Sequence, residues 1–356
     1  MTATGTIPLV RVQGDPFECG RQHGAARAEA LRAFIADGLC RLDRLLPRPA
    51  SMASLRERLA EYGAEIAAAT PLLAEEIRGL AEGAGIDVEE ALLLQLRREI
   101  MGYQRVPSLG DCTTYAWSGA PPVLAQTVDL NGGLDDQIAV LEVARAGSSR
   151  RSLVLSFAGL LGYLGVNSEG LAVGLNLVLG GEWRPGLPPY LAIRHLLDTA
   201  SGVEEAVDIL SSLRLASSRS FTLCDAGGSC WVEVLGDEVR TLAAPVTTHT
   251  NHFLHPDLAV HDELNVFAAN FSRLRLERCR TALTALPPDA GVEDHFAILA
   301  APPICVDGDG DIRRERTVAA VVVRPDRGEL HVRPGDPSRS RTRSFALREE
   351  EAHGGP

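Results

Sequence analysis

One of the seven cysteines in this 356-residue chain lies in a setting where a thiol could do chemistry. The cysteines are scattered, odd in number and contain no CxxC pair, which argues against a disulfide framework and against a zinc site. Most are expected to be small buried hydrophobic residues. Cys112 differs because it follows the turn-like pair Gly110-Asp111, where a helical region gives way to strands.

A cysteine that starts a strand after a turn holds its sulfur beside its own backbone nitrogen. If the Asp111–Cys112 peptide bond is cut, that nitrogen becomes an α-amine with a pKa of about 7.7–8.0. A base that titrates near neutral pH beside a thiol is the pair that nucleophilic catalysis requires. From the residues alone, Cys112 is therefore either an inert turn residue or such a nucleophile.

Two other patterns suggest metal ligands without meeting their requirements. The histidines of segment 249–255 are spaced by three, but they follow a predicted strand and no helical pattern gathers them on one face. The acidic run 307–311 resembles the start of a calcium loop, yet Ile312 stands where that loop needs glycine. We expect neither a metal nor a cofactor.

Charge and composition narrow the class of protein. The net charge is −12, which disfavours nucleic acid as a partner and suits an amine-bearing substrate. Every basic residue is arginine, so lysine chemistry such as Schiff-base formation is absent. No apolar run reaches the ~20 residues that span a bilayer, and no secretory signal is visible. We expect a cytoplasmic protein that has no membrane partner.

The elements that must position Cys112 follow from hydrophobic periodicity. Residues 15–105 are predicted to be mostly helical, after a short strand at Ile7–Gln13. Beyond Pro107, short apolar runs separated by Gly, Asn, Asp and Ser predict strands. Further helices are expected at Pro188–Ala200, Val203–Leu213, Ser272–Leu283 and Val292–Leu299, and a frayed or surface-bound tail at Pro334–Pro356. The mixture predicts an α+β protein with layered antiparallel sheets and helices outside.

Several short motifs, weak singly, occur in a specific order between about residues 9 and 335. They are Gly14-Asp15-Pro16, Gly20-Arg21-Gln22-His23-Gly24, Cys112-Thr113-Thr114, Gln126-Thr127-Val128-Asp129, Gly165-Val166-Asn167-Ser168-Glu169-Gly170, Thr250-Asn251-His252-Phe253, Ser272-Arg273 with Arg278, and Thr317-Val318-Ala319. With them the chain resembles the acyl-CoA:6-aminopenicillanic acid acyltransferase family (peptidase family C45), which are cysteine-type N-terminal nucleophile (Ntn) hydrolases and acyltransferases.

The resemblance implies an αββα four-layer sandwich and self-cleavage between Asp111 and Cys112. Residues 1–111 would form a helical α chain and residues 112–356 the Ntn-hydrolase core as a β chain. The two would stay together as a heterodimer, with a higher homo-oligomer left open. Relatives often carry glycine before the cysteine, and Asp111 stands there in this chain.

The resemblance also implies roles for individual residues. Cys112 would be the nucleophile, with its α-amine as general base, and Asn251 would stabilise the oxyanion. Asp129 would orient the amine, although it is equally readable as a turn residue. Arg316 would pair with a carboxylate in the site. Hydroxyl or backbone N–H groups of Thr113 and Thr114 would contact the substrate.

The expected reaction is hydrolysis of a linear amide of a small N-acyl or aminoacyl compound through an S-acyl enzyme on Cys112. One alternative is transfer of an acyl group from CoA or another thioester to an amine. An alternative of another class is an unprocessed, non-catalytic binding protein on the same fold.

Overall fold

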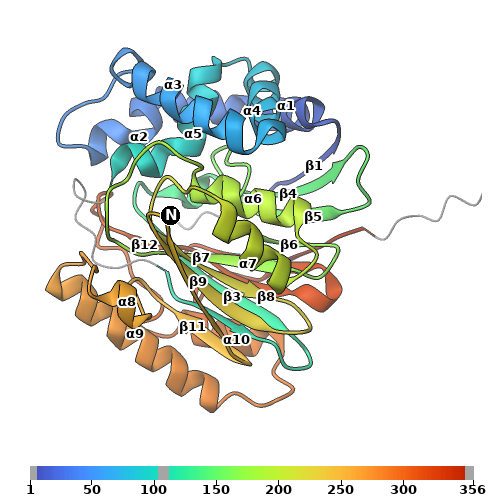
Figure 1. The fold of residues 1–356 in the computed structure, drawn as a ribbon, viewed down its shortest axis with the longest axis vertical. Helices are drawn as coiled ribbons and strands as arrows, with labels where there is room; N and C mark the ends of the chain where they lie inside the picture. Colours follow the sequence, from blue (N-terminus) through green and yellow to red (C-terminus); the bar gives the residue numbers. More distant parts are fainter. Residues whose placement is uncertain (1–5, 103–111, 349–356) are drawn as a thin grey trace, which may run out of the picture.

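Two β-sheets pack face to face at the centre of the protein, and helices cover both outer faces (Figure 1). The computed structural model describes residues 6–102 and 112–348. Strands β2 and β3 of one sheet contact β7 and β8 of the other, so the main core lies between the sheets. The predicted α+β four-layer sandwich is confirmed.

The larger sheet has eight strands and the smaller one six. In spatial order the larger contains β1 (Leu9–Gly14), β4 (Ile138–Arg145), β5 (Arg151–Phe157), β6 (Leu164–Asn167), β7 (Ala172–Leu177), β8 (Arg219–Cys224), β9 (Ser229–Leu235) and β10 (Glu238–Ala243). The smaller contains β11 (Val246–His249), β2 (Thr114–Trp117), β3 (Val123–Leu130), β12 (Arg316–Arg324), β13 (Glu329–Pro334) and β14 (Arg343–Ala346). Only β1 and β4 pair in parallel among these strands. Central strands such as β7 are buried along their whole length, because both faces of each sheet are covered.

Helices form three groups around the sheets. The N-terminal group, blue to cyan in Figure 1, contains α1 (Pro16–Ala36), α2 (Gly38–Leu45), α3 (Met52–Ala69), α4 (Pro71–Ala84) and α5 (Val88–Met101). The larger sheet is covered by α1, α6 (Pro189–Thr199) and α7 (Val203–Ser212). On the smaller sheet lie α9 (Val266–Thr284) and α10 (Val292–Ala300), with the short α8 (Pro256–Ala259) nearby and 3₁₀ turns at Leu134–Asp136 and Pro325–Arg327.

Helices α1 and α4 touch through their backbones. A Cβ atom on Gly20 would lie 1.9 Å from the Glu76 carbonyl oxygen, and one on Gly79 would lie 1.9 Å from the Phe17 carbonyl oxygen. Gly24 makes a similarly close approach to α4. The Gly20–Gly24 motif therefore serves packing: only glycine permits this separation.

A buried ion-pair network joins the N-terminal helices to the core. Glu76 on α4 forms ion pairs with Arg194 on α6 (2.9 Å) and with Arg145 on β4 (2.8 Å). Asp198 completes the network by pairing with both arginines at 3.0 Å. Because removal of one partner leaves a buried charge uncompensated, the network fixes the orientation of α4 against α6.

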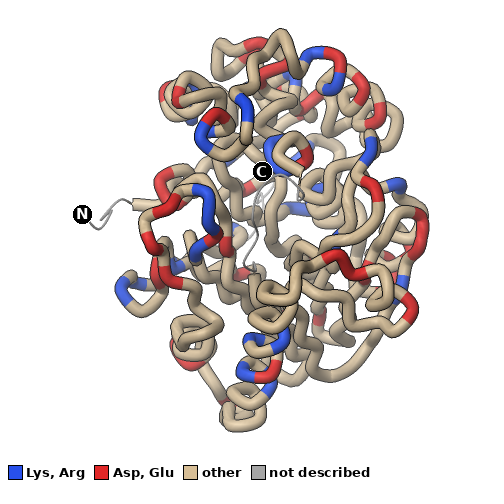
Figure 2. The backbone as a smooth tube through the Cα atoms, turned by 90° about the vertical axis from the view of Figure 1, so that its left-hand side faces the viewer, with Lys and Arg blue, Asp and Glu red and all other residues tan. Residues whose placement is uncertain are grey.

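The structure corrects one sequence expectation and refines others. The tail predicted to be frayed or surface-bound contains strand β14, which pairs with β13 from Val332↔Arg343 to Glu329↔Ala346, so that this part is not frayed. Strand β1, which precedes the helices, pairs with β4 of the core sheet. Acidic and basic residues are interspersed along the outer helices and loops in Figure 2. No helix in the described parts of the chain has both the length and the apolar character needed to cross a membrane.

Substituting Gly79→Ala should lower the free energy of unfolding by about 3 kcal/mol, because the new methyl group meets a backbone carbonyl that cannot move cheaply. Urea denaturation measures the change. Gly63→Ala on α3 is the matched control: its methyl meets only the flexible Leu92 side chain at 3.2 Å, so it should be neutral or stabilising. Equal losses in the two variants would contradict a backbone contact between α1 and α4.

Acidification should destabilise the protein partly through His23. Burial lowers the pKa of His23 from 6.5 to about 4, so the unfolded chain binds a proton that the folded one excludes between these values. The free energy of unfolding should therefore fall as pH drops from 6.5 to 4, with roughly 3 kcal/mol from this residue. His23→Leu should flatten that dependence and the exposed control His261→Leu should not. An unchanged acid slope in His23→Leu would contradict this assignment.

Candidate active site

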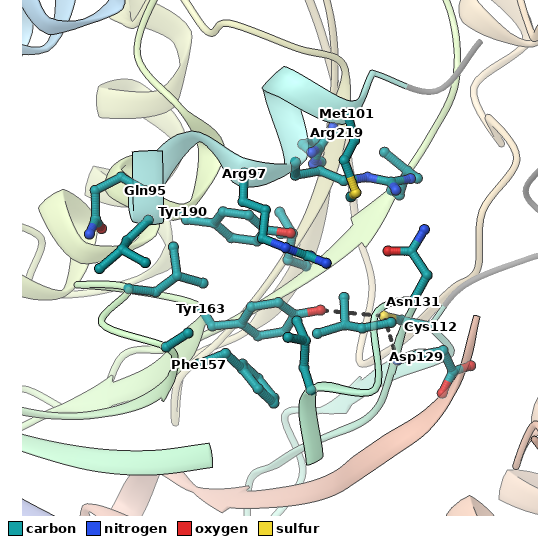
Figure 3. Close-up of a pocket in the computed structure, with 18 of the residues that line it drawn as sticks. Gln95, Arg97, Met101, Cys112, Asp129, Asn131, Phe157, Tyr163, Tyr190 and Arg219 are labelled. Atoms are coloured by element: carbon teal, nitrogen blue, oxygen red, sulfur yellow. Dashed lines mark hydrogen bonds between the residues drawn. The ribbon is translucent and has the colours of Figure 1, made fainter. Parts of the chain in front are cut away.

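Cys112 lies immediately before β2, at the seam between the two sheets, and only 3% of its surface is exposed. Its sulfur accepts a hydrogen bond from the backbone N–H of Asp129 (3.4 Å), which belongs to the neighbouring strand β3. The sulfur also lies 3.7 Å from the Tyr163 hydroxyl (Figure 3). A polar N–H and a hydroxyl thus face the atom expected to react.

The backbone carbonyl of Cys112 is held from two directions. Asn176 on β7 donates its side-chain N–H to this oxygen at 2.8 Å, and Arg275 on α9 donates to it at 3.0 Å. Arg275 is fully buried and also donates to the hydroxyl of Thr113 (2.9 Å) and to the amide oxygen of Asn251 (2.6 Å). One guanidinium therefore fixes the positions of Cys112, Thr113 and Asn251 relative to one another.

Asp129 is fully buried and lies where the pairing between β3 and β12 changes register. Thr317, its partner across the sheet, donates its hydroxyl to Asp129 Oδ1 at 2.7 Å. Irregularities of this kind occur often beside active sites because they redirect a side chain. Here the irregularity aligns the Asp129 carboxylate and, through its N–H, the Cys112 sulfur.

Asn251 lies in a turn after β11 that buried polar groups hold rigidly. The Glu233 carboxylate accepts from His249 Nε2 (2.8 Å) and from the backbone N–H groups of Leu254 (2.5 Å) and His255 (3.0 Å). Ser272 on α9 binds the backbone N–H of Asn251 at 2.9 Å. Asn251 itself donates to the Leu177 carbonyl at 2.9 Å. The histidine-rich segment thus supports a turn, and no metal-holding group of three ligands occurs among the described residues.

A single side chain ties the two sheets together close to Cys112. Gln126 on β3 donates to the Leu175 carbonyl (2.8 Å) and accepts from the Leu175 N–H (3.0 Å), so it pairs with β7 as another strand would. Gly174 makes room, since a Cβ there would lie 2.8 Å from the Gln126 side-chain oxygen. The sulfur therefore lies on a rigid frame, which reactive groups need.

A cavity of about 720 Å³, counting the part open to solvent, begins at the Cys112 sulfur. Most of its walls are apolar: they include Phe34, Leu94, Met101, Leu130, Leu134, Phe157, Leu160, Leu175 and Leu177. Tyr163 stacks on Tyr190 with ring centroids 5.2 Å apart and contacts Phe157 edge-on at 5.1 Å. A cavity of this size with mostly apolar walls suits a small ligand with an apolar part.

Cations dominate the charge of the cavity wall, in contrast to the acidic chain as a whole. Among the described residues, Arg97, Arg98 and Arg219 line it, against one carboxylate, that of Asp129. Arg219 lies 3.4 Å from the Glu99 carboxylate, and burial raises the pKa of that carboxyl above its ordinary value. The sequence-based preference for an amine-bearing substrate, drawn from net charge, finds no support in this wall.

Of the predicted residues, Cys112 and Asp129 line the cavity, whereas the buried Asn251 does not. Thr113 and Thr114 are fully buried beside Cys112 but do not line it. Arg316 forms an ion pair with Asp135 and is not part of the wall. Asp111, the other half of the proposed cleavage site, lies outside the described residues.

The other six cysteines are buried, as the sequence predicted. Burial raises the pKa of Cys19, Cys40, Cys224, Cys279 and Cys305 to about 12 and that of Cys230 to about 11. Since the thiolate is the reactive form, these thiols are poor nucleophiles at neutral pH.

The roles of Arg275, Asn176 and Gln126 were not predicted from the sequence. Arg275 lies within the helix predicted at Ser272–Leu283, and its only sequence signal is a charged residue on the apolar face of that helix. Gln126 likewise interrupts an apolar strand. A polar residue within an otherwise apolar helix or strand was the only indication of these roles. The sequence does not show with which distant groups such a residue forms hydrogen bonds.

This geometry, a cysteine starting a strand at the seam of a layered α+β fold, agrees with the comparison to known proteins. The chain belongs to the acyl-coenzyme A:6-aminopenicillanic acid acyl-transferase family, whose model matches residues 118–339. That match includes Asp129, Asn251 and Arg316 and begins after Cys112. The expected family is thereby confirmed.

One curated relative is the 40 kDa form of acyl-coenzyme A:6-aminopenicillanic-acid-acyltransferase from Emericella nidulans. It is 30% identical over 271 residues, which cover 74% of each chain. Solved structures with a similar fold include penicillin V acylase from Agrobacterium tumefaciens (16% identity, TM-score 0.47, 66% of this chain and 86% of that one). A mutant of conjugated bile acid hydrolase from Clostridium perfringens is another (12% identity, TM-score 0.47, 66% and 92%).

Replacing Arg275 should destabilise the site more than replacing an exposed arginine of the same helix. Arg275→Met leaves buried acceptors on Thr113 and Asn251 without this donor, so the free energy of unfolding should fall by roughly 2–4 kcal/mol. The control is Arg278→Met, an identical substitution at an exposed position of α9, which should change it by less than about 0.5 kcal/mol. Urea denaturation measures the free energy of unfolding of both variants. Equal losses in Arg275→Met and Arg278→Met would contradict the role of Arg275.

Proposed function

We propose that this protein is a self-processing amide hydrolase whose nucleophile is Cys112 at the N-terminus of its β chain. Its substrate would be a linear amide of a small N-acyl or aminoacyl compound. The observation that carries the proposal is the sulfur of Cys112 opening onto an apolar cavity while two buried donors hold the carbonyl of the same residue. Family membership supports the same class of chemistry.

In the proposed self-cleavage, the Cys112 sulfur attacks the carbonyl carbon of Asp111. A C–S bond forms, the C–N bond between the two residues breaks, and the nitrogen takes up the thiol proton to become an amine. Water then hydrolyses the thioester, which restores the thiol and leaves a carboxylate on Asp111. The pieces 1–111 and 112–356 would stay together through the β1–β4 pairing and the Glu76 ion pairs.

In turnover, the new α-amine would accept the thiol proton as the sulfur attacks the substrate carbonyl. Asn251, whose side-chain amide donates to the Leu177 carbonyl, is proposed to stabilise the developing oxyanion. Loss of such a donor typically costs ~2.7–4 kcal/mol of barrier. The leaving amine takes the proton, and water releases the acyl group from the S-acyl enzyme.

Asp129 is proposed to orient the α-amine. Its N–H already contacts the sulfur, and its carboxylate is held by Thr317, so the whole residue is fixed relative to Cys112. Thr113 would act through the backbone of the nucleophile, since its own N–H binds Thr127 at 3.0 Å. Arg316, paired with Asp135, takes no part in the proposed reaction.

A second candidate is acyl transfer from a thioester to an amine, which the Emericella nidulans relative favours because it is an acyltransferase. A panel of N-acyl amino acids, aminoacyl amides and acyl thioesters distinguishes the two. Each compound is incubated with the enzyme, S-acyl adducts are sought on the fragment beginning at Cys112, and release is compared with and without an added amine. Release that depends on the amine would replace hydrolysis with transfer.

Intact-mass spectrometry tests the proposal directly. Purified protein should give species matching residues 1–111 and 112–356, and the second should begin Cys-Thr-Thr-Tyr. Cys112→Ala should remain one chain without turnover, and Cys112→Ser should process more slowly because a hydroxyl is a weaker nucleophile at neutral pH. Cys230→Ala serves as the matched control and should process normally. A full-length mass after long incubation, or full activity in Cys112→Ala, would overturn the proposal.

A further inference from the structure

One cation in the cavity wall lacks the partner that a buried charge needs. Arg97 on α5 is 9% exposed, and its Nη2 has no hydrogen-bond partner among the described residues. After burial, the neighbours that contribute most to the shift of its pKa are the Cys40 thiol, Arg98, the Tyr190 hydroxyl and Arg41, and none of these is a carboxylate. Burial lowers its pKa to about 10, so the guanidinium stays protonated at neutral pH. An unpaired buried charge is costly and is usually retained for a ligand.

The guanidinium is held from behind and directed across the cavity. Arg97 Nε donates to the Cys40 carbonyl at 2.8 Å, and the guanidinium lies 6.0 Å from the centre of the Phe34 ring. Residues 39–41 have positive φ angles of 53°, 60° and 63°, an unfavourable conformation for non-glycine residues that turns the Cys40 carbonyl toward Arg97. Figure 3 shows the guanidinium reaching toward the side of the cavity where Asn131 and Cys112 lie.

A second unpartnered donor lies on that opposite side. Asn131 lines the cavity, is 2% exposed, and its Nδ2 has no partner within the described chain. It precedes Gly132, where a Cβ atom would lie 2.3 Å from Arg97 Nη2, so glycine makes the room that the guanidinium occupies. Gly132 comes three residues after Asp129, whose N–H binds the Cys112 sulfur, and three residues span at most about 11 Å.

We propose that Arg97 and Asn131 form a carboxylate-binding subsite beside Cys112, so that the substrate carries a carboxylate about one amino-acid length from the scissile bond. This deepens the proposed function and rests on it. A planar guanidinium with an adjacent amide donor matches the two oxygens of a carboxylate. The apolar walls then hold the rest of the molecule, and the carboxylate supplies the charge that Arg97 lacks.

Matched alkylating reagents test the subsite without knowledge of the substrate. The Cys112 thiolate displaces iodide from iodoacetate or from its neutral counterpart iodoacetamide, and from N-iodoacetylglycine or N-iodoacetylglycinamide, whose charge lies farther from the reacting carbon. Rate constants come from the mass of the Cys112 peptide. For each pair we divide the rate constant of the acid by that of the amide, which cancels the fraction of Cys112 present as thiolate. Dividing this ratio by the ratio measured for free cysteine then removes the intrinsic difference between the two reagents.

In the wild-type protein this normalised ratio should be about 10 or more for at least one pair. Arg97→Gln should reduce it about 10-fold or more, and Asn131→Ala several-fold, as expected for loss of hydrogen bonds to a charged group. Arg97→Lys keeps the positive charge but lacks the planar guanidinium, so it should give an intermediate ratio. It also provides a test if Arg97→Gln does not fold. Arg44→Gln, an exposed arginine of α2 outside the cavity, changes net charge equally and should leave the ratio within about twofold.

A normalised ratio near one for both pairs overturns the subsite, as does a preference that survives in Arg97→Gln, or a Cys112 that none of the four reagents reaches. These results are separable from failure of the proposed function. Alkylation requires only a thiol and its neighbours, whereas missing fragments and missing S-acyl adducts would reject the hydrolase while leaving the anion preference measurable.

Discussion

The carbonyl group of Cys112 is the point on which the arrangement of the site depends. It receives hydrogen bonds from Asn176 in one sheet and from Arg275 on a helix that covers the other. Because both donors are buried, neither contact exchanges readily with water, and the residue has little freedom to rotate about its backbone. The sulfur then meets Asp129 and Tyr163 at distances set by the packing of the sheets. A nucleophile on a surface loop would have no such support.

Different parts of the chain contact Cys112 and form the wall of the cavity. The groups that contact Cys112 are Asp129 on β3, Asn176 on β7, Arg275 on α9 and Tyr163. Helix α5 contributes a large part of the cavity wall, and α1 contributes Phe34. The charge of the cavity wall also differs from that of the whole chain: the wall is rich in arginine, whereas the chain carries a net charge of −12. Net charge summarises mainly exposed residues, and the recognition of a ligand depends on the few charges that are buried beside it. This is why the composition pointed to an amine, whereas the arginines of the cavity wall led us to propose an anionic ligand.

Much of the architecture could be predicted from the sequence, because it rests on local patterns. Helical periodicity placed the N-terminal helices and α6, α7 and α10, and short apolar runs placed most strands. The tail strand β14 was missed since it has only four residues, mostly exposed and two of them polar, and its pairing with β13 could not be seen in the sequence. The family followed from ordered short motifs. Arg275 and Arg97 could not be found this way, since their meaning depends on which distant groups they meet or fail to meet.

The glycine contact between α1 and α4 has a consequence for redesigning the cavity wall. Where two helices touch backbone to backbone, their spacing does not depend on the shapes of side chains elsewhere on their surfaces. The α1–α4 spacing is therefore fixed, and the side chains that α5 contributes to the cavity wall can be varied without changing that contact. Substitutions on α5 should then reshape the wall, while the Cys112 sulfur keeps its position beside β3.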